Sequence, residues 1–145
     1  MQRRNLFKTV IAAVVGTIAA GTAVKAASPG KMRVVYHLSD AEKVSFVLSN
    51  MQNHLDGAGA DNVTLAIVVH GPALKSFHLL GADPEVSKRL SALKSSAVEL
   101  NACGNTMRAQ KVELADLLPG FVKAEKGGVV RLAELQSEGW LYLRP

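Results

Sequence analysis

The chain of 145 residues contains a single cysteine, Cys103. One thiol cannot form a disulfide within the chain. In an oxidising compartment such a residue is buried, paired with another molecule, or used chemically. The sequence also shows no internal repeat and no low-complexity tract. These absences exclude a disulfide-stabilised scaffold and direct attention to the role of one sulfur atom.

Several motifs with known chemistry are missing. There is no G-x-S-x-G elbow for a nucleophilic serine, and Ser39 and Ser45 are better explained as a helix cap and an exposed helix residue. Gly57 and Gly59 follow an expected helix instead of preceding one, and no G-K-S or G-K-T is present, so a phosphate-binding loop is excluded. The four histidines lack the spacing of metal ligands. We expect no cofactor and no metal, and the sequence leaves open whether the protein is an enzyme.

The first 26 residues have the pattern of a signal peptide. The basic residues at the start are Arg3, Arg4 and Lys8. Thr9–Val24 carries no charge, and small residues then surround a cleavage position after Ala26. The two arginines resemble the twin-arginine export motif. An uncleaved anchor is the alternative, but the uncharged stretch spans about 24 Å as a helix, less than a bilayer core of about 30 Å. We expect a periplasmic protein that meets the membrane only through this signal.

The basic charge of the whole chain belongs mostly to its N-terminus. The chain has 17 Lys and Arg against 12 Asp and Glu, a net charge of +5. Four of the 17 bases lie in the expected signal peptide, which leaves 13 against 12, or +1. The remaining chain shows no basic cluster, so nucleic acid is excluded as a partner.

The remaining 119 residues (145 less 26) suit a single domain with one core. We interpret residues 27–32 as a flexible lead-in and residues 33–145 as the domain. Five apolar runs predict strands at Arg33–Leu38, Val63–Val69, Ala97–Ala102, Phe121–Ala124 and Trp140–Leu143. The second run is apolar throughout, which is typical of a parallel sheet buried on both faces.

The segments between these runs predict helices. Ser39 and Glu42 have capping-box spacing, and Asp83-Pro84 places a cap before a proline at the first helical position. A further helix should run from Cys103 to about Leu118. The alternation predicts an α/β fold: a single domain with a five-stranded, mainly parallel sheet, helices on both faces and the flavodoxin-like strand order 2-1-3-4-5.

The stretch Asn101–Gln110 places the only cysteine between a strand end and a helix start. Open α/β sheets carry their working groups there, and backbone N–H groups at the positive end of a helix dipole favour a thiolate. Arg108 would add a positive charge, Asn105 would cap the helix, and Gly104 would let a partner approach the backbone closely. The alternative is that Cys103 is a small buried hydrophobic residue.

Two histidines, His37 and His70, also follow predicted strands and should share one sheet edge with Cys103. A histidine close to a thiol can accept its proton. Alternatively, each ring hydrogen-bonds a loop backbone.

Five pieces of the chain resemble the DsrE/DsrF-like family, in its subgroup of small exported members. They are VVYHLSD at Val34–Asp40, VLSNMQNHLDG at Val47–Gly57, VTLAIVVHGPAL at Val63–Leu74, ACGNTM at Ala102–Met107, and DLLPGFVKAEKGGVVRLAELQSEGWLYLRP at Asp116–Pro145. Together they cover nearly all of residues 27–145.

The resemblance implies a parallel α/β sheet and association into trimers or hexamers. The best understood members are sulfur-relay subunits, in which a cysteine after a strand accepts sulfane sulfur as a persulfide and passes it to a partner. Cys103 lies at the matching place, so the resemblance implies a sulfur donor or acceptor protein as partner. Those members are cytoplasmic and work in a complex, whereas this chain carries an expected export signal.

We therefore interpret the protein as a periplasmic sulfur carrier that uses Cys103. One alternative is a non-catalytic module that binds a small ligand between His37, His70 and Asn105, with Cys103 inert. Another is an oligomeric accessory subunit. A reactive thiol with a lowered pKa distinguishes the first interpretation from the others.

Overall fold

The structure, a computed structural model, describes residues 30–145. The expected signal peptide and its cleavage position, at residues 1–26, lie outside the described residues, as do residues 27–29 of the expected lead-in. Met32, the last residue of that lead-in, already belongs to the first strand. Within residues 30–145, no helix has the length and apolar character needed to cross a membrane.

Five strands form one parallel sheet. They are β1 (Met32–Leu38), β2 (Val63–Val69), β3 (Glu99–Cys103), β4 (Phe121–Ala124) and β5 (Leu141–Leu143). All four neighbouring pairs are parallel, which confirms the expected α/β fold with a five-stranded parallel sheet. The continuous apolar run of β2 forms the central strand and is almost completely buried, as that run predicts.

The order of the strands differs from the prediction. The sheet runs β4-β3-β2-β1-β5, not 2-1-3-4-5, so β1 lies between β2 and β5. Strands 1 to 4 are added one after another in one direction, and the chain then returns across the sheet to place β5 beside β1. Hydrophobic periodicity shows which segments are strands, but it does not specify which strands are neighbours. As a result β2, not β1, is the direct neighbour of the cysteine-bearing strand.

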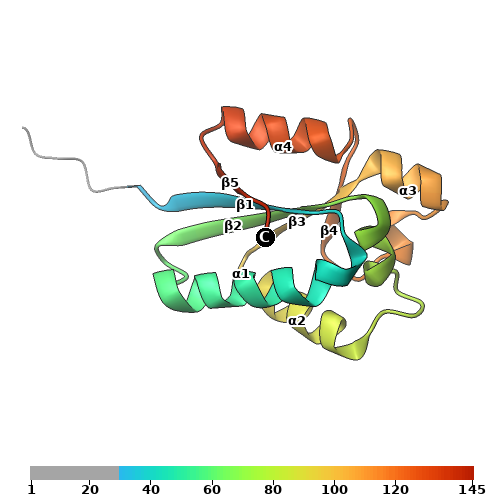
Figure 1. The fold of residues 1–145 in the computed structure, drawn as a ribbon, viewed down its shortest axis with the longest axis horizontal. Coiled ribbons are helices and arrows are strands. Elements are labelled where there is room, and N and C mark those ends of the chain that lie inside the picture. The colour runs from blue at the N-terminus through green and yellow to red at the C-terminus, as the bar shows by residue number, and fades with distance from the viewer. Residues whose placement is uncertain (1–29) are drawn as a thin grey trace, which may run out of the picture.

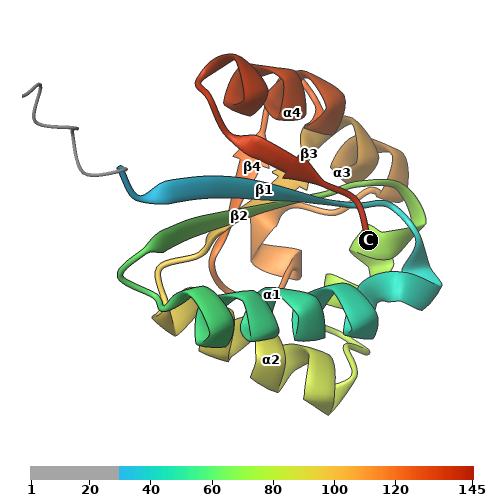
Figure 2. The same cartoon turned by 60° about the vertical axis from the view of Figure 1, so that its left-hand side comes forward.

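Helices cover both faces of the sheet, as expected (Figure 1). The helices α1 (Val44–Ala58) and α2 (Pro84–Ser95) lie side by side on one face, and α4 (Gly128–Ser137) lies on the other. Figure 2 shows the same two layers from another side, with α3 (Gly104–Gln110) beyond the end of β3. Short 3-10 turns at Ala41–Lys43, Gly71–Phe77 and Leu114–Asp116 complete the connections. The sheet divides the core into a larger cluster beneath α1 and α2 and a smaller one beneath α4.

Two predicted helix boundaries are wrong. The capping box of Ser39 and Glu42 does not form, because the Ser39 hydroxyl donates to the Asp40 carboxylate (3.0 Å) and a 3-10 turn precedes α1. The helix after Cys103 ends at Gln110, not near Leu118. Lys111 takes a left-handed conformation (φ 55°), and the Val112 N–H bonds the Met107 carbonyl (3.0 Å), so a Schellman motif ends the helix. The cap at Asp83 is confirmed, since its side chain accepts the Glu85 N–H.

Candidate functional site at the carboxyl edge of the sheet

Four chemically active side chains come from four neighbouring strands near the carboxyl edge of the sheet. Cys103 ends β3, His70 follows β2, His37 lies near the end of β1, and Tyr142 lies on β5. The sheet register pairs Val69 with Ala102, so the next residues, His70 and Cys103, are lateral neighbours. Both Cβ atoms lie within 3.4 Å of the position that a side chain at Gly128 would take, so the two side chains are neighbours on the sheet without a direct hydrogen bond between them.

All four side chains occupy the face of the sheet that α4 covers. Successive residues of a strand point to opposite faces. Val35 and Val68 pack beneath α4, and His37 and His70 each follow one of them by two residues. Tyr142 is the register partner of Val35. Cys103 meets α4 at Gly128, the first residue of that helix. Both histidines and the thiol therefore lie at the same edge of the sheet.

The Cys103 sulfur lies in a cradle of hydrogen-bond donors. Burial raises the pKa of the Cys103 thiol, but hydrogen-bond donors near the sulfur outweigh this effect and lower the pKa overall. The groups responsible are the Thr106 hydroxyl and the backbone N–H groups of Thr106, Gly128 and Asn105, which lie near the sulfur, although the Cys103 side chain makes no capping hydrogen bond to α3. The Thr106 oxygen itself accepts the N–H of Gly71 (2.9 Å), which fixes its hydroxyl in place. Because these donors favour the charged form, the site stabilises a thiolate.

Two glycines bring α4 close to the thiol. A side chain at Gly128 would lie 3.2 Å from Cβ of Cys103 and 3.4 Å from Cβ of His70. A side chain at Gly127 would lie 4.0 Å from the sulfur and would collide with the Asn105 side chain at 2.5 Å. Gly127 also has φ of 102°, which other residues rarely adopt. The Gly127-Gly128 pair is therefore required for the close approach of a helix N-terminus to Cys103.

The two histidines bond each other instead of the loop backbone. Nε2 of His37 contacts Nε2 of His70, and the ring centroids are 4.7 Å apart. Nδ1 of His37 bonds the Tyr142 hydroxyl (2.6 Å). Burial lowers the pKa of His37 to about 4, helped by His70 and Arg144 and opposed by Asp40. Burial and Arg144 also lower the pKa of His70. Both rings are thus neutral at pH 7, each with one N–H and one lone pair.

The other predicted site residues have different roles from those expected. Asn105 does not cap α3, because Cys103 occupies the N-cap position and Asn105 lies inside the helix. The Arg108 guanidinium donates to the Asn105 side chain and is not among the groups that shift the pKa of the thiol. Gly104 faces β4, where an added side chain would lie 2.9 Å from the Ala124 carbonyl oxygen. Gly104 therefore allows α3 to pack closely against β4 and does not open a path for a partner.

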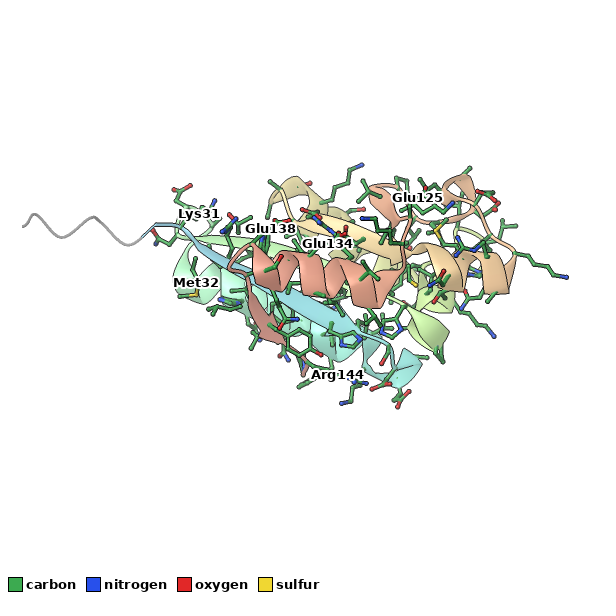
Figure 3. The ribbon with its side chains drawn as sticks, turned by 90° about the horizontal axis from the view of Figure 1, so that it is seen from above. Lys31, Met32, Glu125, Glu134, Glu138 and Arg144 are labelled. Atoms are coloured by element: carbon green, nitrogen blue, oxygen red, sulfur yellow. The ribbon has the colours of Figure 1, made fainter. Side chains whose placement is uncertain are left out.

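A cleft of about 380 Å³ lies between α4 and the strands β3 and β4, and Cys103 is not among the residues that line it. Ala124, the register partner of Cys103, lines it together with Gly127. Three ion pairs cross or flank it: Lys123 with Glu125 (3.2 Å), Lys126 with Glu134 (3.4 Å) and Arg131 with Glu99 (2.8 Å). Glu125 and Glu134 can be followed in Figure 3. Cys103 is itself only 6% exposed.

Sequence reasoning missed Thr106, Gly128 and Tyr142. The role of Thr106 was predictable in principle, because a hydroxyl three residues after the N-cap residue of a helix can lie close to the side chain of that residue. Gly128 comes close to the thiol only through the packing of α4, and Tyr142 only through the pairing of β5 with β1. Among residues 30–145, the His, Cys, Asp and Glu side chains form no group of three that could hold a metal ion.

Comparison with known proteins assigns this chain to a family. A model of the DsrE/DsrF-like family matches residues 35–145, and the chain belongs to this family. A solved protein of unknown function from Methanobacterium thermoautotrophicum, MTH1491, is 31% identical, with a TM-score of 0.69 over 79% of this chain and 99% of that one. Comparison with curated proteins gives no match.

Two further solved structures have the same fold at lower identity. The ychN protein from E. coli is 15% identical over 79% of this chain and 100% of its own, with a TM-score of 0.58. BT1422 from Bacteroides thetaiotaomicron, a conserved protein of unknown function, is 16% identical over 78% of this chain and 94% of its own, with a TM-score of 0.60.

Proposed function

We propose that the protein is a sulfur carrier in which Cys103 holds sulfane sulfur as a persulfide. The observation that carries this proposal is the cradle of donors around the Cys103 sulfur, which lowers the pKa of the thiol in spite of its burial. A cysteine that served only as packing would gain nothing from hydrogen-bond donors placed near its sulfur. Membership of the DsrE/DsrF-like family, whose best understood members relay sulfur, supports the same role.

The chemistry needs no cofactor. The Cys103 thiolate attacks the outer sulfur of a donor persulfide, R–S–SH. A bond forms between Sγ and that sulfur while the S–S bond of the donor breaks, and the bonding electron pair leaves with R–S⁻. The product is Cys103–S–SH, and no external oxidant is consumed. The donors that stabilise the thiolate are suited to the persulfide anion as well, since both place negative charge on sulfur.

We also propose that this carrier works in the periplasm as a homo-oligomer, with a donor or acceptor protein as its partner. The signal-peptide pattern of residues 1–26 supports export, and the family resemblance supports a trimer or hexamer. N-terminal sequencing of the exported protein should begin at Ala27. Recovery of residues 1–26 on membrane-bound protein would contradict cleavage, and Arg3→Lys with Arg4→Lys should block export by the twin-arginine route.

The reactivity of the native thiol tests the proposed function. We expect iodoacetamide to alkylate Cys103 in the folded protein at neutral pH, faster than it alkylates a free cysteine of ordinary pKa. The Cys103→Ser variant, which lacks the only thiol, is the control for labelling elsewhere. If Cys103 resists alkylation until the protein unfolds, the carrier is ruled out, and the ligand-binding module that uses His37, His70 and Asn105 takes its place.

A further inference from the structure

A chain of polar contacts crosses the sheet at right angles to the strands and leads toward the thiol. Tyr142 contacts His37, and His37 contacts His70, each on the next strand. His70 is then the lateral neighbour of Cys103 on the same face. The proposed function uses the thiol and its donors but leaves this row of three side chains without a role.

The two rings meet tip to tip, which is the geometry of a shared proton. Their centroids are 4.7 Å apart, their planes differ by 24°, and the two Nε2 atoms are in contact. With both rings neutral, one Nε2 must donate and the other must accept. Within residues 30–145, Nδ1 of His70 has no hydrogen-bond partner in the protein. That nitrogen is therefore free to serve a group beside it.

We propose that His70, His37 and Tyr142 form a proton relay that carries the proton of the Cys103 thiol to solvent. The proposal rests on the proposed function, because a relay is useful only to a thiol that reacts. His70 is the group that exchanges the proton with sulfur, while His37 and Tyr142 act through it.

The steps conserve protons without any change of net charge on the rings. The thiol proton passes to Nδ1 of His70, and the Nε2 proton of His70 passes to Nε2 of His37. The Nδ1 proton of His37 passes to the Tyr142 oxygen, and the Tyr142 hydroxyl proton leaves to water. Tyr142 is 39% exposed, so the outer end of the relay reaches solvent. Run in reverse, the relay returns a proton when a thiolate is the leaving group.

The charges around the relay favour passage of the proton over its retention. Burial disfavours an imidazolium at either ring, and the Arg144 guanidinium adds to that effect at both. Asp40 opposes it, but its carboxylate also pairs with Arg144 at 3.7 Å. A proton that enters this row is therefore not trapped as a charged histidine.

The test is the rate of persulfide formation with sodium polysulfide as the probe, measured from pH 5 to 9 in H₂O and D₂O. We expect His70→Gln to lower the rate constant by at least about tenfold near pH 7, within the usual range for proton-transfer catalysis. Added imidazole should restore part of the rate in His70→Ala. Tyr142→Phe keeps the ring on the exposed edge strand and should also slow the reaction and reduce its solvent isotope effect.

A second tyrosine–histidine pair provides matched controls. Tyr36 bonds His54 (2.9 Å) on the opposite face of the sheet, so Tyr36→Phe and His54→Gln should leave the rate unchanged. Wild-type rates and pH profiles in both His70→Gln and Tyr142→Phe would overturn the relay. So would a slow His70→Ala that imidazole does not rescue, together with an unaffected Tyr142→Phe.

Iodoacetamide alkylation, run on the same variants, separates the relay from sulfur transfer. If the wild-type protein gains no sulfur but its alkylation still depends on His70 and Tyr142, the proposed function fails and the relay stands. If sulfur is gained at the same rate in every variant, the relay fails and the carrier stands.

Discussion

At the scale of single residues, the electrostatics of the thiol depend on Thr106. Among the nearby donors its hydroxyl does most to lower the pKa of the thiol, while its oxygen accepts the Gly71 N–H (2.9 Å). The hydroxyl proton remains available to the sulfur, since a hydroxyl can donate and accept at the same time. Thr106 thus links the start of α3 to the turn after β2. The hydrogen bond that orders this turn also positions the side chain whose hydroxyl lowers the pKa of the thiol.

Thr106→Val should raise the pKa of the Cys103 thiol and slow its alkylation at neutral pH. The substitution also removes the acceptor of the Gly71 N–H, which should cost about 1–3 kcal/mol of unfolding free energy. Thr106→Ser keeps the hydroxyl and should behave as the wild type in both respects. Thiolate absorbance against pH gives the pKa, and chemical denaturation gives the stability. A thiol pKa that does not change in Thr106→Val would remove Thr106 from the cradle.

His37 should make stability depend on pH in a defined direction. Its pKa is lowered from 6.5 to about 4 in the folded protein, so the unfolded state binds more protons between these values. The unfolding free energy therefore falls as the pH decreases from about 6.5 toward 4. Each pH unit is worth about 1.4 kcal/mol, which gives a loss of about 3 kcal/mol for a single group. In His37→Gln this part of the loss should be absent when denaturation is compared at pH 7 and pH 4.5.

The site residues that sequence reasoning identified are those with a local signal. Cys103 ends a strand before a helix, and His37 and His70 lie near or just after strand ends, so one rule about parallel sheets places all three. The role expected of Asn105 is wrong because the helix cap lies two residues earlier, at Cys103, and the role expected of Arg108 is wrong because its guanidinium bonds Asn105. Side-chain direction at the first turn of a helix depends on which residue becomes the N-cap, and the sequence does not decide that by itself.

At the scale of elements, the N-terminus of α4 matters more to the site than α3 alone. The Gly127-Gly128 turn allows α4 to pack closely on Cys103 and His70. The helix therefore places a backbone N–H near the sulfur and also covers both side chains. The sequence marks this pair as a break between strand and helix. What it could not show is that the break faces the thiol, because α4 follows β4 in the chain but crosses strands β3, β2 and β1.

Gly128→Ala should both destabilise the protein and raise the pKa of the Cys103 thiol. The added methyl group meets atoms of Cys103 and Val68 at 3.2 Å, and crowding of this kind costs about 1–3 kcal/mol. Relief by movement of α4 would also withdraw the Gly128 N–H from sulfur. Gly57→Ala is the control, since nothing lies within 4 Å of its added carbon, and it should be neutral or slightly stabilising. Equal behaviour of the two variants in denaturation and thiol titration would contradict this account of the turn.

The elements themselves were largely predictable, and their order was not. Continuous apolar runs identify all five strands, and the run of β2 indicates its burial on both faces. The start of α1 and the end of α3 were misplaced because a serine hydroxyl found a nearer partner and a lysine adopted a left-handed conformation. Strand order depends on long-range pairing, which local periodicity does not encode.

At the scale of the whole molecule, one edge of the sheet is unprotected among the described residues. β5 has three residues, and Leu141, Tyr142 and Leu143 are each at least 39% exposed. An apolar edge strand invites pairing with another chain unless something covers it. Symmetric self-association would cover the backbone of this edge together with Leu141 and Leu143, whose side chains lie on the face opposite to that of Tyr142.

We expect the protein to form a trimer or hexamer, and Leu141→Lys to shift it toward smaller species. A charge on an edge strand disfavours edge-to-edge pairing. Light scattering at micromolar concentration gives the mass of the assembly. Phe46→Lys, which changes an exposed apolar residue of α1 away from this edge, is the matched control and should leave the mass unchanged. A wild-type protein that is only monomeric would contradict this expectation.

The central claim, that Cys103 carries sulfur, is tested most directly by intact mass after exposure to polysulfide or thiosulfate. The wild-type protein should gain the mass of one sulfur atom, lose it on reduction, and gain it again on a second exposure. The Cys103→Ser variant should fold normally and gain nothing. A wild-type mass that does not change, or a gain that survives in Cys103→Ser, would contradict the account.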